Sequence, residues 1–141
     1  MSVRKLLVAF AVGLAAMSGL SAGVADAAGP GQAAGVWRNP KNTVHVRMQS
    51  CGDTVCGTII WADARAQQKA REAGTARLIG TQLFREFRQT GPGEWSGRVF
   101  VPTIGRTFSG SMKAEGRNAI TGRGCLIGRF LCKTQTWTRI S

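Results

Sequence analysis

The sequence is poor in the residues from which most catalytic and metal sites are built. Its 141 residues include one His, no Tyr and seven Asp or Glu. A single imidazole, His45, excludes any site that needs two histidines, and so few carboxylates argue against a cage for a hard cation. The length also leaves no room for a doubly wound or (β/α)8 enzyme of about two hundred residues or more. We therefore expect no metal and no cofactor.

Catalysis is the least favoured hypothesis for the same reason. A nucleophile needs a base within hydrogen-bond reach, and His45 is predicted to lie on the polar face of a strand, without a motif such as G-x-S-x-G. The few carboxylates show no spacing that would bring two of them together. We expect no catalytic residue and treat an enzyme of unknown class only as an alternative.

Long apolar runs are confined to the N-terminus. A short basic segment precedes the run Leu6 to Leu20, and Ala25-Asp26-Ala27 offers small residues at the positions that a signal peptidase reads. The run is shorter than the roughly 20 residues of a spanning helix, and no basic cluster follows it, which disfavours an uncleaved anchor. We predict a signal peptide over residues 1–27, no membrane span after processing, and one domain over 28–141 in the periplasm or outside the cell.

Four cysteines form two local pairs, Cys51-x4-Cys56 and Cys125-x6-Cys132. An exported chain with an even number of cysteines normally forms disulfides. Three connectivities are possible, and we favour Cys51 with Cys56 and Cys125 with Cys132, because each pair brackets a Gly-containing segment between two strand-like runs. The competing hypothesis is a zinc site of four thiolates, but zinc sites usually show tighter C-x2-C spacing and reducing surroundings.

The rest of the chain consists of short runs in which apolar and polar residues alternate, and these runs are separated by Gly, Pro and Asn. Val44, Val46 and Met48, for example, alternate with Thr43, His45 and Arg47. The expected strands begin with Gly35 to Trp37 and continue over Thr43 to Met48, Val55 to Trp61, Gly80 to Gln89, Glu94 to Val101, Arg106 to Met112, Asn118 to Cys125 and Cys132 to Ile140. One segment, Asp63 to Gly74, contains helix formers between an Asp cap and a terminal Gly. We expect a short helix there, over the surface or across one mouth of the fold.

Eight short strands at this spacing predict an all-β fold, an antiparallel meander closed into a small barrel that removes both sheet edges. An open sandwich is the alternative. A barrel of eight strands is either filled by side chains or holds one small ligand.

Two groups of residues resemble known families. Gly35-x-Trp37 and Arg139 are similar to the lipocalin or calycin signature, in which an arginine packs across the tryptophan that closes the base of the barrel. The blocks CG-x3-CG-x-I-x-W, from Cys51 to Trp61, and C-x-x-Q-T-W-T-R, from Cys132 to Arg139, resemble the bacterial exported family known as domain of unknown function 2147. The second resemblance covers nearly the whole mature chain and implies a small envelope β-barrel with no assigned activity.

This chain departs from that family pattern in several places. The acidic, Asn-rich stretch expected after Trp61 is a basic segment from Arg65 to Arg71, and Phe100 and Phe108 stand where Tyr is expected. If the acidic stretch binds a cationic ligand in relatives, we do not expect that binding here.

The candidate ligand-binding residues are aromatic and polar side chains that the strands would bring into the barrel. Four tryptophans fall on separate strands, and Gln135 and Arg139 share a face of the last strand with one of them by period two, as does Lys133. If that face points inward, the cavity suits a small anionic or amphipathic ligand. If the tryptophans are core, there is no such pocket. The candidates are Trp37, Trp61, Trp95, Gln135, Trp137 and Arg139.

The charge is strongly positive, with 19 Lys or Arg and a net charge of +12. Most of the basic residues are arginines spread over the predicted strands, so we expect a broadly basic surface. No aromatic-basic RNA-binding motif is present, and we expect no nucleic-acid partner. Beside the enzyme alternative, two functions follow: a monomeric binding module with a small ligand cavity, or a basic protein that binds an anionic envelope polymer or lipopolysaccharide. The other explanation of the high net charge is solubility alone.

Overall fold

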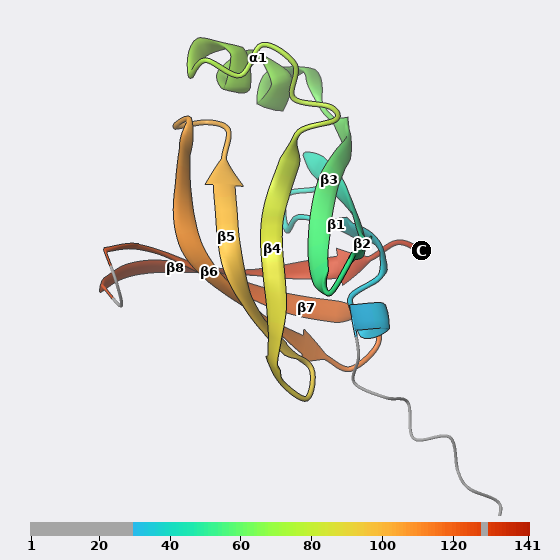
Figure 1. The fold of residues 1–141 in the computed structure, drawn as a ribbon. Coiled ribbons are helices and arrows are strands. Elements are labelled where there is room, and N and C mark those ends of the chain that lie inside the picture. Colours follow the sequence, from blue (N-terminus) through green and yellow to red (C-terminus); the bar gives the residue numbers. More distant parts are fainter. Residues whose placement is uncertain (1–29, 128–129) are drawn as a thin grey trace, which may run out of the picture.

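The computed structural model describes residues 30–127 and 130–141. Eight antiparallel strands follow one another in chain order and close into a barrel, with the first strand paired to the last (Figure 1). The strands are β1 (Gly35–Arg38), β2 (Val44–Cys51), β3 (Thr54–Ala62), β4 (Gln82–Gly91), β5 (Glu94–Val101), β6 (Arg106–Glu115), β7 (Ala119–Ile127) and β8 (Phe130–Arg139). The predicted closed meander is confirmed, and the open sandwich is wrong.

Two short helices complete the described chain, η1 (Pro30–Gln32) before β1 and α1 (Ala64–Glu72) between β3 and β4. Asp63 caps α1, because its side chain accepts a hydrogen bond of 2.7 Å from the Ala66 amide. The helix buries only Ala70 and lies across one end of the barrel, at the top of Figure 1. The predicted helix and its N-terminal cap are therefore confirmed.

The core follows from the alternation of apolar and polar residues along the strands. In β2, Val46 and Met48 are buried and Arg47 between them is exposed, as a strand with one solvated face requires. The largest fully buried side chains come from five different strands, β1 to β5. They are Trp37, Trp95, Phe87, Ile59, Val46 and Val55.

An irregularity in β4 and a glycine in β3 allow aromatic rings to fill the barrel. Glu86 adopts a positive φ of 54° at an irregularity in the β4–β5 pairing, so that Phe84 and Phe87 are both buried, with ring centroids 5.7 Å apart. Gly57 in β3 faces one of these rings, and an added Cβ there would lie 2.7 Å from Phe84 Cδ2 and 2.8 Å from Met48 Sδ. Glycine is therefore required at position 57 by close packing rather than by its backbone angles.

The barrel closes where β1 meets β8, and Trp37 lies directly opposite Arg139 in that pairing. The Trp37 indole donates a hydrogen bond of 2.9 Å to the Ala33 carbonyl. The Arg139 guanidinium donates to the carbonyls of Ala34 at 2.5 Å and Gln32 at 3.0 Å, and lies over the Trp37 ring. The arginine that the resemblance expects to pack across the closing tryptophan is confirmed.

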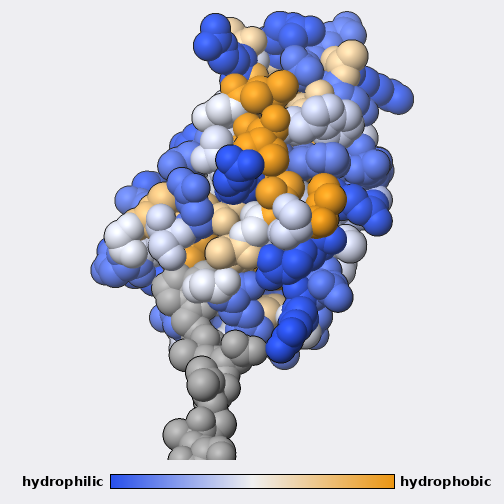
Figure 2. Space-filling view, turned by 90° about the vertical axis from the view of Figure 1, so that its right-hand side faces the viewer, coloured by the Kyte–Doolittle hydropathy of each residue, from blue (hydrophilic) through white to orange (hydrophobic). Residues whose placement is uncertain are grey.

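The side of the barrel shown in Figure 2 is mostly hydrophilic. Hydrophobic atoms form a narrow strip there between wide hydrophilic areas. Within residues 30–127 and 130–141, no helix has the length and apolar character needed to cross a bilayer.

Candidate functional site

The structure separates the four tryptophans into an inner group of three and one outer residue. Trp37, Trp95 and Trp137 are buried in the barrel core. Trp61 is 41 % exposed and packs on His45, with ring centroids 4.4 Å apart. Its prediction as part of an inner cluster is wrong, because a register shift between His45 and Val46 lets Trp61 pair with His45, on the polar side of β2.

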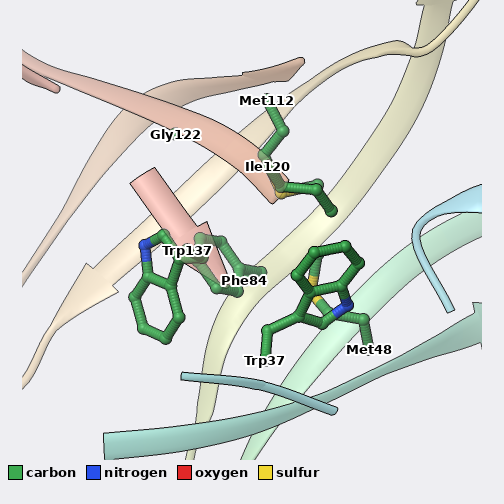
Figure 3. Close-up of a pocket in the computed structure, with 7 residues that line it drawn as sticks. All are labelled: Trp37, Met48, Phe84, Met112, Ile120, Gly122 and Trp137. Carbon is green, nitrogen blue, oxygen red and sulfur yellow. The ribbon is translucent and has the colours of Figure 1, made fainter. Parts of the chain in front are cut away.

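The part of the barrel interior between Trp37 and Trp137 is filled by side chains. Figure 3 shows Trp37 and Trp137 with Phe84 among the side chains that converge there, and Phe84 and Trp137 meet edge to face at 5.5 Å. The space enclosed by these side chains is about 10 Å³. That volume is at the lower limit for a single water molecule, so the ligand cavity proposed for this part of the barrel is not open here. The lining residues are Trp37, Met48, Phe84, Met112, Ile120, Gly122 and Trp137.

The face of β8 that carries Gln135, Trp137 and Arg139 does point inward. Trp137 is buried and Gln135 and Arg139 are half-buried, whereas the intervening Thr136 and Thr138 are exposed. Arg139 is engaged by backbone carbonyls, including that of Arg117 at 2.6 Å. Trp137 packs in the core, so these residues stabilise the barrel in this structure and leave no open site.

One buried group inside the barrel lacks a partner among the described residues. The Trp95 side chain is 1 % exposed, and its Nε1 atom has no hydrogen bond. An indole N–H left unsatisfied in a core costs about 1 to 3 kcal/mol. Trp37 differs, because its indole donates to the Ala33 carbonyl.

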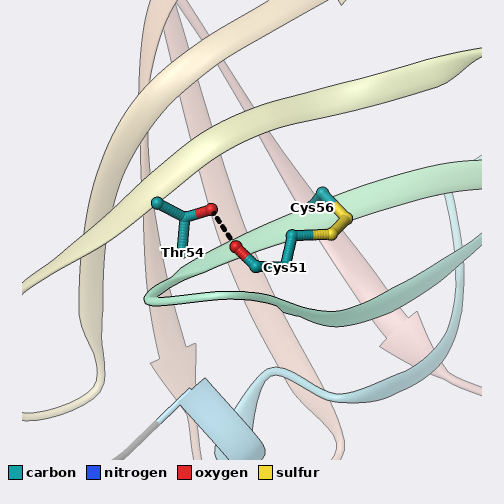
Figure 4. Close-up of a disulfide and its surroundings, with 3 residues drawn as sticks. All are labelled: Cys51, Thr54 and Cys56. Atoms are coloured by element: carbon teal, nitrogen blue, oxygen red, sulfur yellow. Dashed lines mark hydrogen bonds between the residues drawn. A yellow bond between two sulfur atoms is a disulfide. The ribbon is translucent and has the colours of Figure 1, made fainter.

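Both predicted disulfides are present. Cys51 and Cys56 lie 5.9 Å apart at Cα and span the β2–β3 turn, where Thr54 Oγ1 also donates a hydrogen bond of 2.9 Å to the Cys51 carbonyl (Figure 4). Cys125 and Cys132 are direct partners in the β7–β8 ladder, with Cα atoms 4.0 Å apart. The four thiols are therefore all used in disulfides, and the zinc alternative is wrong.

A groove lies on the outer face of β5 to β8 and encloses about 320 Å³. One row across the four strands runs Ser96, Ser111, Arg123 and Thr134, each residue opposite the next in the ladder. With neighbouring strands about 4.8 Å apart, this row spans about 14 Å. The full lining is Thr90, Glu94, Trp95, Ser96, Ser111, Met112, Lys113, Thr121, Arg123 and Thr134.

A second row beside the first contributes charge of both signs. Glu94, Lys113 and Thr121 follow one another across β5, β6 and β7. In the part of the chain that the structure describes, neither the Lys113 nor the Arg123 side chain has a hydrogen-bond or ion-pair partner. The groove therefore presents two available cations, one carboxylate and several hydroxyls to solvent.

Two other carboxylates, Asp53 and Glu86, form surface ion pairs, and His45 lies beside the Asn42 side chain. Asp53 pairs with Arg88 at 2.7 Å and Glu86 with Arg98 at 2.9 Å, all on the exposed surface. The hydrogen bond and charge of Arg88 lower the pKa of Asp53. Burial and, to a smaller extent, the Arg38 charge lower the pKa of His45, whose Nε2 lies 2.7 Å from Asn42 Oδ1. No group of three or more metal-ligating side chains gathers anywhere in the described ranges.

The groove residues were not among the predicted site residues. Their alternation with buried residues, such as Ser96 beside Trp95 and Ser111 beside Met112, does place them on the outer face of their strands. What the sequence does not supply is the register, which brings Ser96, Ser111, Arg123 and Thr134 into one row.

Comparisons with known proteins agree with the fold. A family model described as "Uncharacterized protein conserved in bacteria (DUF2147)" matches residues 35–139. A solved structure, protein HP1028 from Helicobacter pylori, described as belonging to the lipocalin family, superimposes with a TM-score of 0.61 at 13 % identity, over 77 % of this chain and 83 % of that one. A search of curated proteins finds no significant match.

Proposed function

Since the chain belongs to DUF2147, a family of uncharacterized bacterial proteins, and folds as a lipocalin-like barrel, we propose that it is a non-catalytic binding protein of the bacterial envelope. It is exported by its N-terminal signal peptide and works in the periplasm or outside the cell. Its ligand is an anionic envelope polymer, held in the groove on the outer face of β5 to β8.

The filled interior directs this proposal to the outer surface. A space of about 10 Å³ inside the barrel cannot admit a small organic ligand unless core side chains move. The groove encloses about 320 Å³ and is open to solvent, and its polar side chains stand on paired strands that fix their spacing. A polymer can lie in an open groove without entering the barrel.

The chemistry of the groove selects a ligand with both negative charge and hydroxyl groups. Arg123 is flanked in its row by Ser111 and Thr134, so a guanidinium and two hydroxyls are available to one phosphate or carboxylate. Glu94 and Lys113, in the neighbouring row, can accept from and donate to sugar hydroxyls. These features fit an acidic or phosphorylated polysaccharide, including the saccharide part of lipopolysaccharide.

The unpartnered Arg123 in a row of hydroxyls is the observation that carries the proposal. A guanidinium without an acidic partner lets an incoming anion bind without breaking an existing ion pair. Other arginines on the barrel exterior, such as Arg88 and Arg98, already pair with Asp53 and Glu86.

Isothermal titration calorimetry with deacylated lipopolysaccharide tests the proposal, and neutral dextran is the control ligand. We expect saturable binding to the first and none to the second, and a decrease in affinity with salt, because exposed charges are screened within about 10 Å at 0.1 M. Arg123→Gln is expected to lower the affinity by roughly tenfold or more, since a hydrogen bond to a charged group contributes about 1.5 to 3 kcal/mol.

Arg47→Gln provides the matched control. Arg47 is an exposed arginine on the outer face of β2, away from the groove, and its substitution removes the same charge. We expect little change in affinity. Equal losses in the two variants would mean that overall charge, and not the groove, binds the polymer, and absence of binding by the wild type would remove the proposal.

A further inference from the structure

We propose that the tip of the β7–β8 hairpin docks this protein on an anionic lipid bilayer. The hairpin tip is defined here as Leu126, Ile127, Phe130 and Leu131, which are between 54 and 75 % exposed. This surface lies beyond the groove and has different chemistry, and Arg123 of the groove is the one residue that the two proposals share.

The hairpin tip extends past the edge of the barrel wall. The β6–β7 pairing ends at Ser109 and Cys125, whereas β7 and β8 continue to pair as far as Ile127 and Phe130. In Figure 1 this hairpin projects sideways from the barrel. Four large apolar side chains therefore stand in solvent at a protruding end, where hydrophobic residues mark an interaction site more often than chance exposure does.

The geometry of the hairpin holds those side chains in place. The Cys125–Cys132 disulfide closes the ladder directly below the hairpin tip. Leu131 adopts a positive φ of 53°, a conformation that glycine tolerates more readily.

The charges near the hairpin tip indicate that its partner is an anionic bilayer. Arg123 and Lys133, which lie below the hairpin tip on β7 and β8, have no anionic partner among the described residues. With a rise of about 3.3 Å per residue, Lys133 lies about 10 Å along the strand from Phe130. Apolar groups at an interface enter the headgroup–acyl boundary by about 5 to 10 Å, so the Ile127 and Phe130 side chains would reach that boundary while Arg123 and Lys133 remain among the lipid phosphates.

A second copy of the chain fits the same surface less well. Two docked hairpin tips would bring together two sets of Arg123 and Lys133, in proteins that each carry a net charge of +12. An anionic bilayer instead supplies charges of the opposite sign.

Co-sedimentation with vesicles of phosphatidylglycerol, compared with vesicles of phosphatidylcholine, tests the proposal. We expect the wild-type protein to bind the anionic vesicles and to bind the neutral ones weakly or not at all. Ile127→Ser/Phe130→Ser changes two exposed side chains and is expected to fold normally, yet to lower binding to anionic vesicles by roughly tenfold or more. All proteins are purified from the envelope of the same bacterial host and share one N-terminus, so residues 1–27 contribute equally to each.

Ile140→Ser is the matched control. Ile140 is 48 % exposed and follows the opposite end of β8, ten residues from Phe130, or about 33 Å at the strand rise. We expect it to bind vesicles as the wild type does. Equal binding by the wild type and the Ile127→Ser/Phe130→Ser variant overturns the proposal, because the whole basic surface would then be responsible. Failure of the wild type to bind anionic vesicles also overturns it, as does self-association that is lost in the same variant.

The polymer-binding function is distinguished by its own ligand. Deacylated lipopolysaccharide has no acyl chains, so the Ile127→Ser/Phe130→Ser variant is expected to bind it with unchanged affinity. A protein that does not bind vesicles would therefore overturn only the membrane proposal. A protein that does not bind deacylated lipopolysaccharide would overturn only the groove proposal.

Discussion

The guanidinium carbon of Arg139 lies 4.2 Å from the centre of the Trp37 ring, which joins the last strand of the barrel to the first. The same guanidinium donates hydrogen bonds to the carbonyls of Gln32 and Ala34, in the segment that precedes β1. An added side chain at Gly35 would collide with Arg139, so the glycine leaves room for this arrangement. One side chain thus connects β8, β1 and the segment that precedes β1.

Arg139→Ala is expected to lower the free energy of unfolding by about 3 kcal/mol, since it removes a cation–π contact and several charged hydrogen bonds at once. Urea unfolding followed by tryptophan fluorescence measures this. Arg47→Ala, which removes an exposed arginine of β2, should change the stability by less than about 0.5 kcal/mol. Similar values for the two variants would contradict the role given to Arg139.

The two buried indoles should respond differently to substitution by phenylalanine. Trp37→Phe removes a hydrogen bond to the Ala33 carbonyl and leaves that carbonyl without its donor, whereas Trp95→Phe removes an N–H that has no partner. We expect Trp37→Phe to be the more destabilising by about 1 to 3 kcal/mol in urea unfolding. A larger loss for Trp95→Phe would show that Trp95 Nε1 is satisfied in solution, for example by a buried water.

Each disulfide should add stability by restricting the unfolded chain. In the chain-entropy model, loops as short as those between Cys51 and Cys56 and between Cys125 and Cys132 contribute about 2 kcal/mol each. Thermal unfolding of the Cys125→Ser/Cys132→Ser variant, with and without reductant, measures the two contributions separately. An unchanged melting temperature in that variant would contradict the expected stabilisation.

The stability should fall as the pH is lowered, because both shifted groups have pKa values below their ordinary ones. Burial lowers the pKa of His45, so its contribution is present above the ordinary histidine value of about 6.5 and is lost as the pH falls through its folded value. The Arg88 interaction lowers the pKa of Asp53, whose contribution is lost at lower pH, below the ordinary range for aspartate. Urea unfolding between pH 5 and pH 8 should show a smaller dependence for His45→Gln than for the wild type, and equal curves would contradict the assignment to His45.

The fold was predictable from the sequence because alternation and turn residues act locally. The eight strands, the helix capped by Asp63, and both disulfides lie close to the predicted positions, since each depends on a few neighbouring residues. The side of the barrel on which Trp61 lies was not predictable, because it depends on a register shift in the β2–β3 pairing.

The candidate site was less accessible to sequence reasoning than the fold. Whether three indoles leave a cavity between them depends on side-chain volumes summed over the whole barrel, and here the remaining space is about 10 Å³. The groove depends on the relative register of four strands, which places Arg123 between Ser111 and Thr134. Neither quantity is encoded in any short segment.

The most direct test of the account is a titration of isotopically labelled protein with deacylated lipopolysaccharide, followed by the shifts of amide and indole N–H resonances. The account predicts saturable shifts at the groove, with Ser111, Arg123 and Thr134 among the largest, while the indole signals of Trp37 and Trp137 stay unchanged. Shifts that begin at those two indoles, with the groove unaffected, would mean that the ligand enters the barrel, and would contradict the claim that this protein binds through its outer face.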